Sequence, residues 1–392
     1  MNTVINHTER AHAILSPSSS KRWLSCTPSA RMEEAENNDG SSNAALEGTV
    51  AHELAEFTLQ RYLDGEYMTS IDQVYPQDSI KDSPFMCEDM IDYITEYVDL
   101  VIEDYLRANG KMYLEKRFDL SKYVPESSGS ADVAIVGREY LHVIDLKYGT
   151  GTPVAAKNNT QMLLYALGMY ETLTEAEKGK IKYVKMTIAQ IRLGLYLTEE
   201  ISVNDLLLWA RRELVPKARK AWAGDGKHVI GDWCKYCKAK AVCPEQRSEM
   251  LDAFEAIKPI ENVSVDELGE LMNKFDQLRG YMVAVEEYTK DKLLKGIPVK
   301  GWKMVKGRSV RKITAPEKVQ EVLDGMGWDA SDYMNYSLKT LTELEKQMGK
   351  RAFSVHLGEY ITLKEGNPAL APASDKREAL SLGINEFETL ES

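Results

Sequence analysis

The chain has 392 residues, with 61 acidic and 49 basic side chains and a formal net charge of −12. Hydrophobic residues make up 43% of it, which excludes a disordered protein and allows a large core in two or three domains. The negative balance argues against bulk coating of nucleic acid, although a local basic path is compatible with it. The sequence holds no run of about 18 apolar residues and no signal peptide, so we expect a cytoplasmic protein with no membrane partner.

Hydrophobic periodicity predicts a mixed α/β (α+β) architecture in roughly the first 250 residues. Two amphipathic helices come first, and the period then changes to that of strands, with a tight hairpin turn at residues 137–139. A cap resembling a capping box at Ser202 opens a later helix. In chain order, the predicted elements are helices over 46–63 and 86–106, strands over 112–118, 131–136 and 140–146, a helix over 159–170, a strand over 182–192 and a helix over 202–222.

The sequence changes character beyond residue 256. We expect one long helix over 265–294, shorter helices after it, and a flexible acidic tail. The predicted domains are therefore residues 1–256, a mainly helical region over 257–365, and the tail over 366–392.

A basic segment follows the long helix. Residues 290–312 hold nine Lys or Arg and one acid, a local charge of +8. Basic side chains beside an aromatic ring can track single-stranded DNA, which makes Lys300, Trp302, Lys303 and Lys306 candidate DNA-binding residues. A solvated β-hairpin, whose lysines offset an acidic helix, is an equal alternative.

The predicted hairpin carries the residues with the clearest chemistry. Asp145 and Lys147 share one face of their strand, Leu146 points into the core, and pairing of the two strands can bring Asp132 beside Asp145. Two carboxylates with a neighbouring ammonium suit a hard divalent cation such as Mg²⁺, which lowers the pKa of a bound water. Taken alone, a solvated surface hairpin explains the same residues equally well.

Two helical pairs add weaker signals. His52 and Glu56 lie one turn apart on one helix face, and so do Gln161 and Tyr165. His52 can be a metal ligand, although a lone helical histidine is more often a packed or solvated residue. Gln161 and Tyr165 can bind phosphate or orient the lysine.

The cysteines indicate a metal site. Cys234, Cys237 and Cys243 fall within ten residues of the five-cysteine chain, so a metal centre is favoured over disulfides. A tetrahedral site needs a fourth thiolate, and Cys26 and Cys87 are the candidates. Cys87 is predicted to lie on the apolar side of a helix, as a buried structural thiol. Zinc and an iron–sulfur cluster both accept four thiolates.

Together these residues resemble the RecB-like branch of the PD-(D/E)XK nucleases. The matching motifs, in the order of that family, are Gly-x-x-x-His-x-x-x-Glu at Gly48, His52 and Glu56, Gly-x-x-Asp at Gly129 and Asp132, Asp-x-Lys at Asp145 and Lys147, and Gln-x-x-x-Tyr at Gln161 and Tyr165. Cys26, Cys234, Cys237 and Cys243 match the layout of its iron–sulfur members, such as AddB-like helicase-nucleases and CRISPR adaptation nucleases. The match spans residues 12–250, and the whole chain is similar to a family of phage and prophage proteins encoded near replication genes.

The resemblance implies a restriction-endonuclease-like fold and a cation site for Mg²⁺ or Mn²⁺. It implies that His52, Asp132, Asp145 and the Leu146 carbonyl bind the ion, that Lys147 positions the attacking water, and that Gln161 and Tyr165 support both the lysine and the DNA backbone. It also implies a structural [4Fe-4S] cluster on the four cysteines, with zinc as the alternative. No Gly-x-x-x-x-Gly-Lys-Ser/Thr segment is present, so we expect no helicase motor in this chain.

The function expected from these features is that of a metal-dependent DNA nuclease, an exonuclease or end-processing enzyme of phage replication or recombination. Its expected partners are single-stranded or duplex DNA ends and phage replication or single-strand-binding proteins. A non-catalytic DNA-binding or scaffold subunit that keeps the nuclease fold is the alternative, and a zinc-stabilised adaptor is a third.

Overall fold

The computed structural model describes residues 13–36, 43–65, 83–151, 153–255 and 264–303, and the single residues Gly349, Arg351 and Val355. The chain divides into two compact units, Met1–Val322 and Leu323–Ser392. All of the helices and strands discussed below belong to the first unit. None of the described helices combines the length and the apolar composition needed to cross a membrane.

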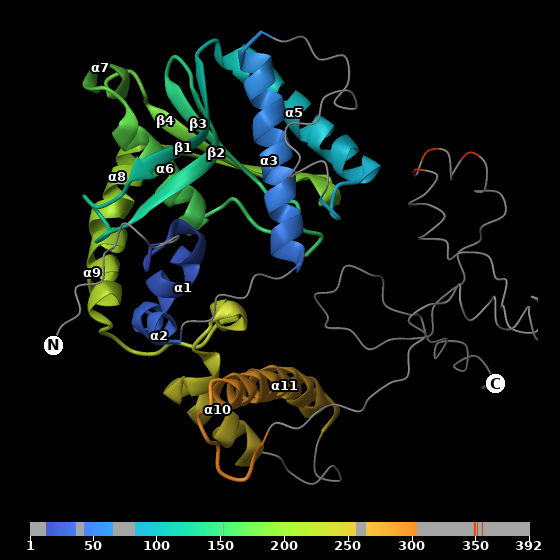
Figure 1. Ribbon diagram of the computed structural model, residues 1–392. Coiled ribbons are helices and arrows are strands. Elements are labelled where there is room, and N and C mark those ends of the chain that lie inside the picture. The colour runs from blue at the N-terminus through green and yellow to red at the C-terminus, as the bar shows by residue number, and fades with distance from the viewer. Residues whose placement is uncertain are drawn as a thin grey trace, which may run out of the picture. The chain divides into compact units, whose positions relative to one another are not determined.

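A five-stranded mixed sheet organises the first unit (Figure 1). The strands are ordered as they occur in the chain, and only β3 and β4 run parallel. Their bounds are β1 (Lys111–Asp119), β2 (Ser128–Val136), β3 (Tyr140–Leu146), β4 (Tyr183–Gln190) and β5 (Leu195–Ser202). The parallel pair needs a long crossover connection, and that connection contains α6 (Thr160–Thr172) and α7 (Glu175–Lys178).

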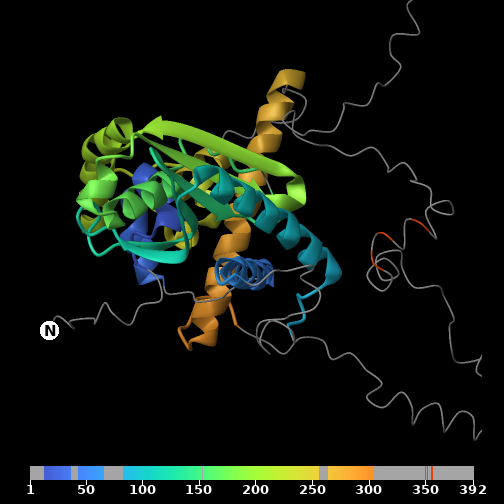
Figure 2. The same ribbon diagram turned by 90° about the horizontal axis from the view of Figure 1, so that it is seen from above.

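Helices cover both faces of the sheet, so the strands β2 and β3 are buried on both sides (Figures 1 and 2). One face packs against α3 (Asn43–Leu63) and α5 (Glu88–Ala108). The other packs against α6, α1 (Ser20–Ser25), α8 (Val203–Trp209) and α9 (Val215–Ala223). The predicted mixed sheet flanked by helices is therefore confirmed.

Most of the predicted elements lie within a few residues of their expected bounds. The helix predicted from Ser202 is α8 and α9 joined by a π-helical segment, Ala210–Leu214, and the Ser202 side chain accepts a hydrogen bond from the Asp205 N–H as its cap. Strand β5 was not predicted, because it is an edge strand whose side chains are only partly buried and lack a clear apolar face.

The described part of the C-terminal region is helical, as predicted. Helix α10 (Pro244–Glu255) ends the predicted first domain, and α11 (Val265–Leu294) in the C-terminal region has the bounds expected from the sequence. Ser264 caps α11 in a complete capping box with Glu267. The expected tail over 366–392 lies outside the described residues.

The alternation of side chains along β1 and β2 inverts at one point. Met112 and Leu114 face the α3–α5 side, whereas Phe118, an even number of residues further on, faces α6. On β2, Ala131 and Val133 likewise belong to opposite faces. Between these residues lies Glu115, whose φ of 41° is in the left-handed region. The pairing register is the same on both sides of Glu115, so the inversion occurs without an inserted residue.

Phe118 sets the distance between α6 and the sheet. A Cβ on Gly168 of α6 would lie 2.1 Å from the Phe118 ring, and one on Gly129 of β2 would lie 2.8 Å from it. Both positions therefore require glycine while the ring keeps this place. Gly129 is also the glycine of the Gly-x-x-Asp segment that ends at Asp132.

Candidate active site

Three carboxylates stand in a row across three neighbouring strands. Leu114 pairs with Val133 and Lys116 with Ala131, so Glu115 of β1 lies opposite Asp132 of β2. Val133 pairs with Ile144, so Asp132 falls opposite Asp145 of β3, one step beyond the last paired residues. The predicted approach of Asp132 and Asp145 thus follows from the register, and Glu115 adds a third carboxylate that sequence reasoning missed.

His52, Glu115 and Asp132 form a group that can hold a metal ion. One ligand atom from each lies within 4.8 Å of the others, and all three side chains are half-buried. The His52 Nδ1 atom is 3.4 Å from the Asp132 Oδ2 atom. An imidazole with two carboxylates is a donor set that binds divalent metal ions in proteins.

Leu146 joins this group through its backbone. Its N–H donates to Asp132 Oδ2 at 2.8 Å, and its backbone also hydrogen-bonds His52. Its side chain packs into the core on the α3–α5 side, as predicted from strand alternation. Glu56, one turn beyond His52, is exposed, and its negative charge adds to the field at Glu115.

The carboxylates of the site are not balanced by nearby positive charge, and two of them have raised pKa values. Burial raises the pKa of Asp132 to about 7, and the charge of Asp145 adds to this effect. Burial also raises the pKa of Glu115, followed by repulsion from Asp132. The pKa of His52 is lowered, mainly by burial, which keeps the imidazole neutral and available as a ligand.

Asp145 is engaged differently. It is 2% exposed, and its carboxylate forms an ion pair with Lys147 at 2.8 Å and accepts a hydrogen bond from Gln161 Nε2 at 3.2 Å. Burial lowers the pKa of Lys147, but Asp145 and Asp132 outweigh that effect and raise it, so the lysine stays charged. Asp145 is thus held in place by the lysine and by Gln161.

Helix α6 supplies the remaining predicted residues. The Asn159 side chain caps its first turn by accepting from the Gln161 and Met162 N–H groups, which fixes the helix start beside the sheet. Gln161 also donates to the Tyr165 hydroxyl at 2.9 Å. Tyr165 therefore contacts Asp145 through Gln161, and burial raises the pKa of its hydroxyl.

The four cysteines predicted to bind a cofactor line one pocket. Cys26 follows α1, and the other three lie on successive short turns of residues 232–243. The pocket has a volume of about 20 Å³ and is partly open to solvent. The pKa of Cys26 is raised, first by burial and further by the charges of Cys243 and Cys234. The four thiols share the lining of this pocket, but among the described residues no three of their sulfur atoms lie within 4.8 Å of one another.

An ion pair and hydrogen bonds connect helices α1 and α2 with the cysteine-containing residues 232–243. Arg22 on α1 forms an ion pair with Glu33 on α2 (Ser29–Ala35) at 2.6 Å, and Glu33 also accepts from the Lys238 N–H. Arg22 further donates to the Tyr236 carbonyl at 3.2 Å. Cys87, the other candidate fourth ligand, precedes α5 at its N-cap, is half-buried and packs against the core on the α3–α5 side.

The predicted DNA-binding residues are described only in part. Lys300, Trp302 and Lys303 are exposed, and 73% of the Trp302 surface is accessible. Lys306 lies outside the described residues.

Comparison with known families shows which family the chain belongs to. A family model described as "Protein of unknown function (DUF2800)" matches residues 12–378, so the chain belongs to this family. Among solved structures, one titled "Crystal structure of SSO0001" is similar at 15% sequence identity, with a TM-score of 0.24, covering 56% of this chain and 94% of that one.

Proposed function

We propose that this protein is a metal-dependent deoxyribonuclease that hydrolyses phosphodiester bonds, acting on DNA ends in phage replication or recombination. The observation that carries the proposal is the row of Glu115, Asp132 and Asp145 with Lys147 beside it, at the level where the β2–β3 pairing ends. Carboxylates with a charged lysine next to a cation site are the groups that phosphodiester hydrolysis needs.

The roles of the residues follow from their contacts. His52, Glu115 and Asp132 would hold Mg²⁺ or Mn²⁺, with the Leu146 backbone alongside. When bound, the ion supplies Lewis acidity and lowers the pKa of a water. Lys147, held by Asp145, orients the attacking water, and Gln161 keeps Asp145 in place.

The cysteine pocket would hold a [4Fe-4S] cluster with a structural role, zinc being the alternative. Such a centre would tie residue 26 to residues 234–243 and close a long loop that includes the whole sheet. Cross-linking a loop of about 200 residues strongly constrains the unfolded chain. The exposed Lys300, Trp302 and Lys303 would contribute to DNA binding.

A scaffold subunit that only binds DNA is the second candidate. It needs a basic surface but no cation, and the exposed basic residues around Trp302 are compatible with it. The ion pair of Lys147 with Asp145 beside the cation ligands favours the nuclease, because DNA binding alone does not need that arrangement.

The test is an assay of anaerobically purified protein on end-labelled single- and double-stranded DNA with Mg²⁺, Mn²⁺ or chelator. We expect cleavage only with a divalent ion. Lys147→Ala should lower the rate by about 10²- to 10⁴-fold, the usual contribution of a positioned proton-transfer group. Lys182→Ala is the matched control, since that exposed lysine pairs with Glu139 on the surface.

Two results would contradict the proposal. Wild-type protein that binds DNA but never cleaves it would favour the scaffold, and undiminished cleavage by the Lys147→Ala variant would show that another group does the chemistry. DNA binding by that variant, measured in chelator, reports whether the fold is intact.

The metal centre has its own test. Anaerobic protein should absorb near 400 nm if it holds the cluster, and Cys237→Ser should lose both the absorbance and the iron. Cys87→Ser should keep both, because Cys87 packs against the core away from the cysteine pocket. A colourless protein with one equivalent of zinc would establish the zinc alternative.

A further inference from the structure

A buried hydroxyl on α5 has no partner. The Tyr97 side chain is 1% exposed, and its Oη atom makes no hydrogen bond within the described part of the chain. Other buried or half-buried tyrosine hydroxyls are satisfied: that of Tyr165 accepts from Gln161, and that of Tyr123 donates to Glu171. Leaving a buried hydroxyl unpaired is destabilising, and phenylalanine in the same place would avoid this cost.

Tyr97 shares a core cluster with residues that border the proposed cation site. This cluster also contains Leu146, whose backbone N–H donates to Asp132. The same cluster includes Ala51, the residue before His52 on α3. Burial, and then the charges of Asp132, Asp145 and Glu115, raise the pKa of the hydroxyl.

The donors already assigned to the cation leave room for water. His52, Glu115 and Asp132 provide one ligand atom each within 4.8 Å of one another. Mg²⁺ prefers six oxygen-rich ligands and keeps several waters when proteins bind it. Each such water is a strong hydrogen-bond donor that needs an acceptor, and the unpaired Tyr97 oxygen is an acceptor that folding alone leaves unused.

We propose that Tyr97 is a positioning residue of the cation site, accepting a hydrogen bond from a water in the hydration shell of the bound ion. The inference rests on the cation site of the proposed function. It explains why a hydroxyl stays buried without a partner: its partner arrives with the ion. Outer-shell groups of this kind usually contribute 10- to 100-fold to metal affinity.

The experiment compares Tyr97→Phe with wild type in two measurements that need no catalysis. Titration calorimetry with Mn²⁺ on chelator-treated protein should show the dissociation constant rising by about 10- to 100-fold. Urea unfolding in chelator should show the midpoint of the variant equal to or above that of wild type, because no hydrogen bond is lost. Tyr105→Phe is the control, since its ring lies farther along α5 against Tyr62; it should bind Mn²⁺ as wild type does.

Three outcomes separate the claims. Unchanged Mn²⁺ affinity in Tyr97→Phe overturns the inference, and so does an unfolding midpoint below that of wild type in chelator, because the hydroxyl would then have a partner within the protein. If wild type itself binds no Mn²⁺, the cation site of the proposed function fails, and the inference fails with it. A weaker affinity with an undiminished midpoint supports both.

Discussion

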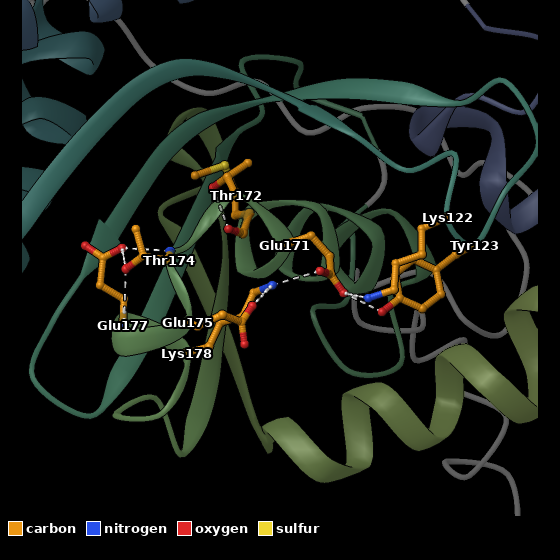
Figure 3. A network of polar contacts seen from close by, with 9 residues as sticks. Lys122, Tyr123, Glu171, Thr172, Thr174, Glu175, Glu177 and Lys178 are labelled. Atoms are coloured by element: carbon orange, nitrogen blue, oxygen red, sulfur yellow. Dashed lines mark hydrogen bonds and ion pairs between the residues drawn. The ribbon is translucent and has the colours of Figure 1, made fainter.

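Helix α6 has a charged cluster near each end, and the two clusters differ in how folding satisfies them. Toward the C-terminal end, Glu171 contacts Lys122, Tyr123 and Lys178 (Figure 3). These partners lower its pKa to about 2 despite its partial burial. At the N-terminal end, Gln161 donates to Asp145, which belongs to the row of three carboxylates in which the pKa of Asp132 is raised to about 7.

The difference teaches which cluster is structural. Around Glu171 one carboxylate meets two ammonium groups, so the network is complete once the chain has folded. In the candidate site three carboxylates face one ammonium, that of Lys147, and the neutral His52 adds no charge. An arrangement that stays electrostatically unsatisfied after folding points to a ligand of opposite charge, and a divalent cation would balance it.

The largest effect is expected from a substitution in the candidate site, where the carboxylates lack balancing charge. Asp132→Asn removes one charge and one cation ligand, so Mn²⁺ affinity measured by calorimetry should fall by about 100-fold or more. Without metal the same change should stabilise the fold, because no buried charge remains at this position and the repulsion with Asp145 and Glu115 disappears. A variant that is less stable in chelator, with unchanged Mn²⁺ affinity, would contradict this account.

The pH dependence of this stabilisation follows from the raised pKa. Folded Asp132 keeps its proton up to about pH 7, whereas the unfolded carboxyl loses it near 3.8. The folded state therefore binds more protons between these values, and the stability of metal-free wild type that is due to this group falls as pH rises through the interval. Urea unfolding at pH 4 and pH 7 should show the gain from Asp132→Asn mainly at pH 7.

A smaller effect is expected from the satisfied cluster. Glu171→Gln removes the charge that Lys122 and Lys178 share, and we expect the free energy of unfolding to fall by about 1–2 kcal/mol. Because the folded pKa is depressed to about 2 from 4.5, the loss should be complete above pH 4.5 and disappear as pH falls through about 2. Mn²⁺ affinity should not change. A metal-dependent effect of this substitution would remove the distinction between the clusters.

The smallest effect is expected at the rim of the satisfied cluster. Glu175 pairs with Lys178 at 3.2 Å, but its side chain is 91% exposed (Figure 3). Glu175→Gln should change the free energy of unfolding by less than about 0.5 kcal/mol, as is usual for exposed ion pairs. This substitution is the matched control for Glu171→Gln, and a comparable loss in both would show that surface charge as a whole, rather than the shared carboxylate, is responsible.

Much of this organisation could be predicted from residue patterns. The long helix α11 has its predicted bounds, and strand alternation correctly placed Asp145 and Lys147 together with Leu146 in the core. The spacing of Cys234, Cys237 and Cys243 indicated a common site, and Cys26 lines the same pocket.

The residues that were missed depend on information that no local pattern contains. Glu115 enters the site through the β1–β2 register and a left-handed backbone conformation, which a single strand pattern does not reveal. Tyr97 lies in the apolar stripe of an amphipathic helix, where an aromatic ring indicates only core packing. Its significance depends on the absence of a partner in the folded molecule.

The ring of Phe118 couples two distant positions of the chain. The ring occupies the space that Cβ atoms at residues 129 and 168 would need. It therefore sets the distance between α6 and the sheet. Relatives that carry alanine or serine at either position should therefore carry a smaller side chain at residue 118. Such compensating replacements in the family would show that the glycine of the Gly-x-x-Asp segment is kept because a side chain there would collide with the Phe118 ring.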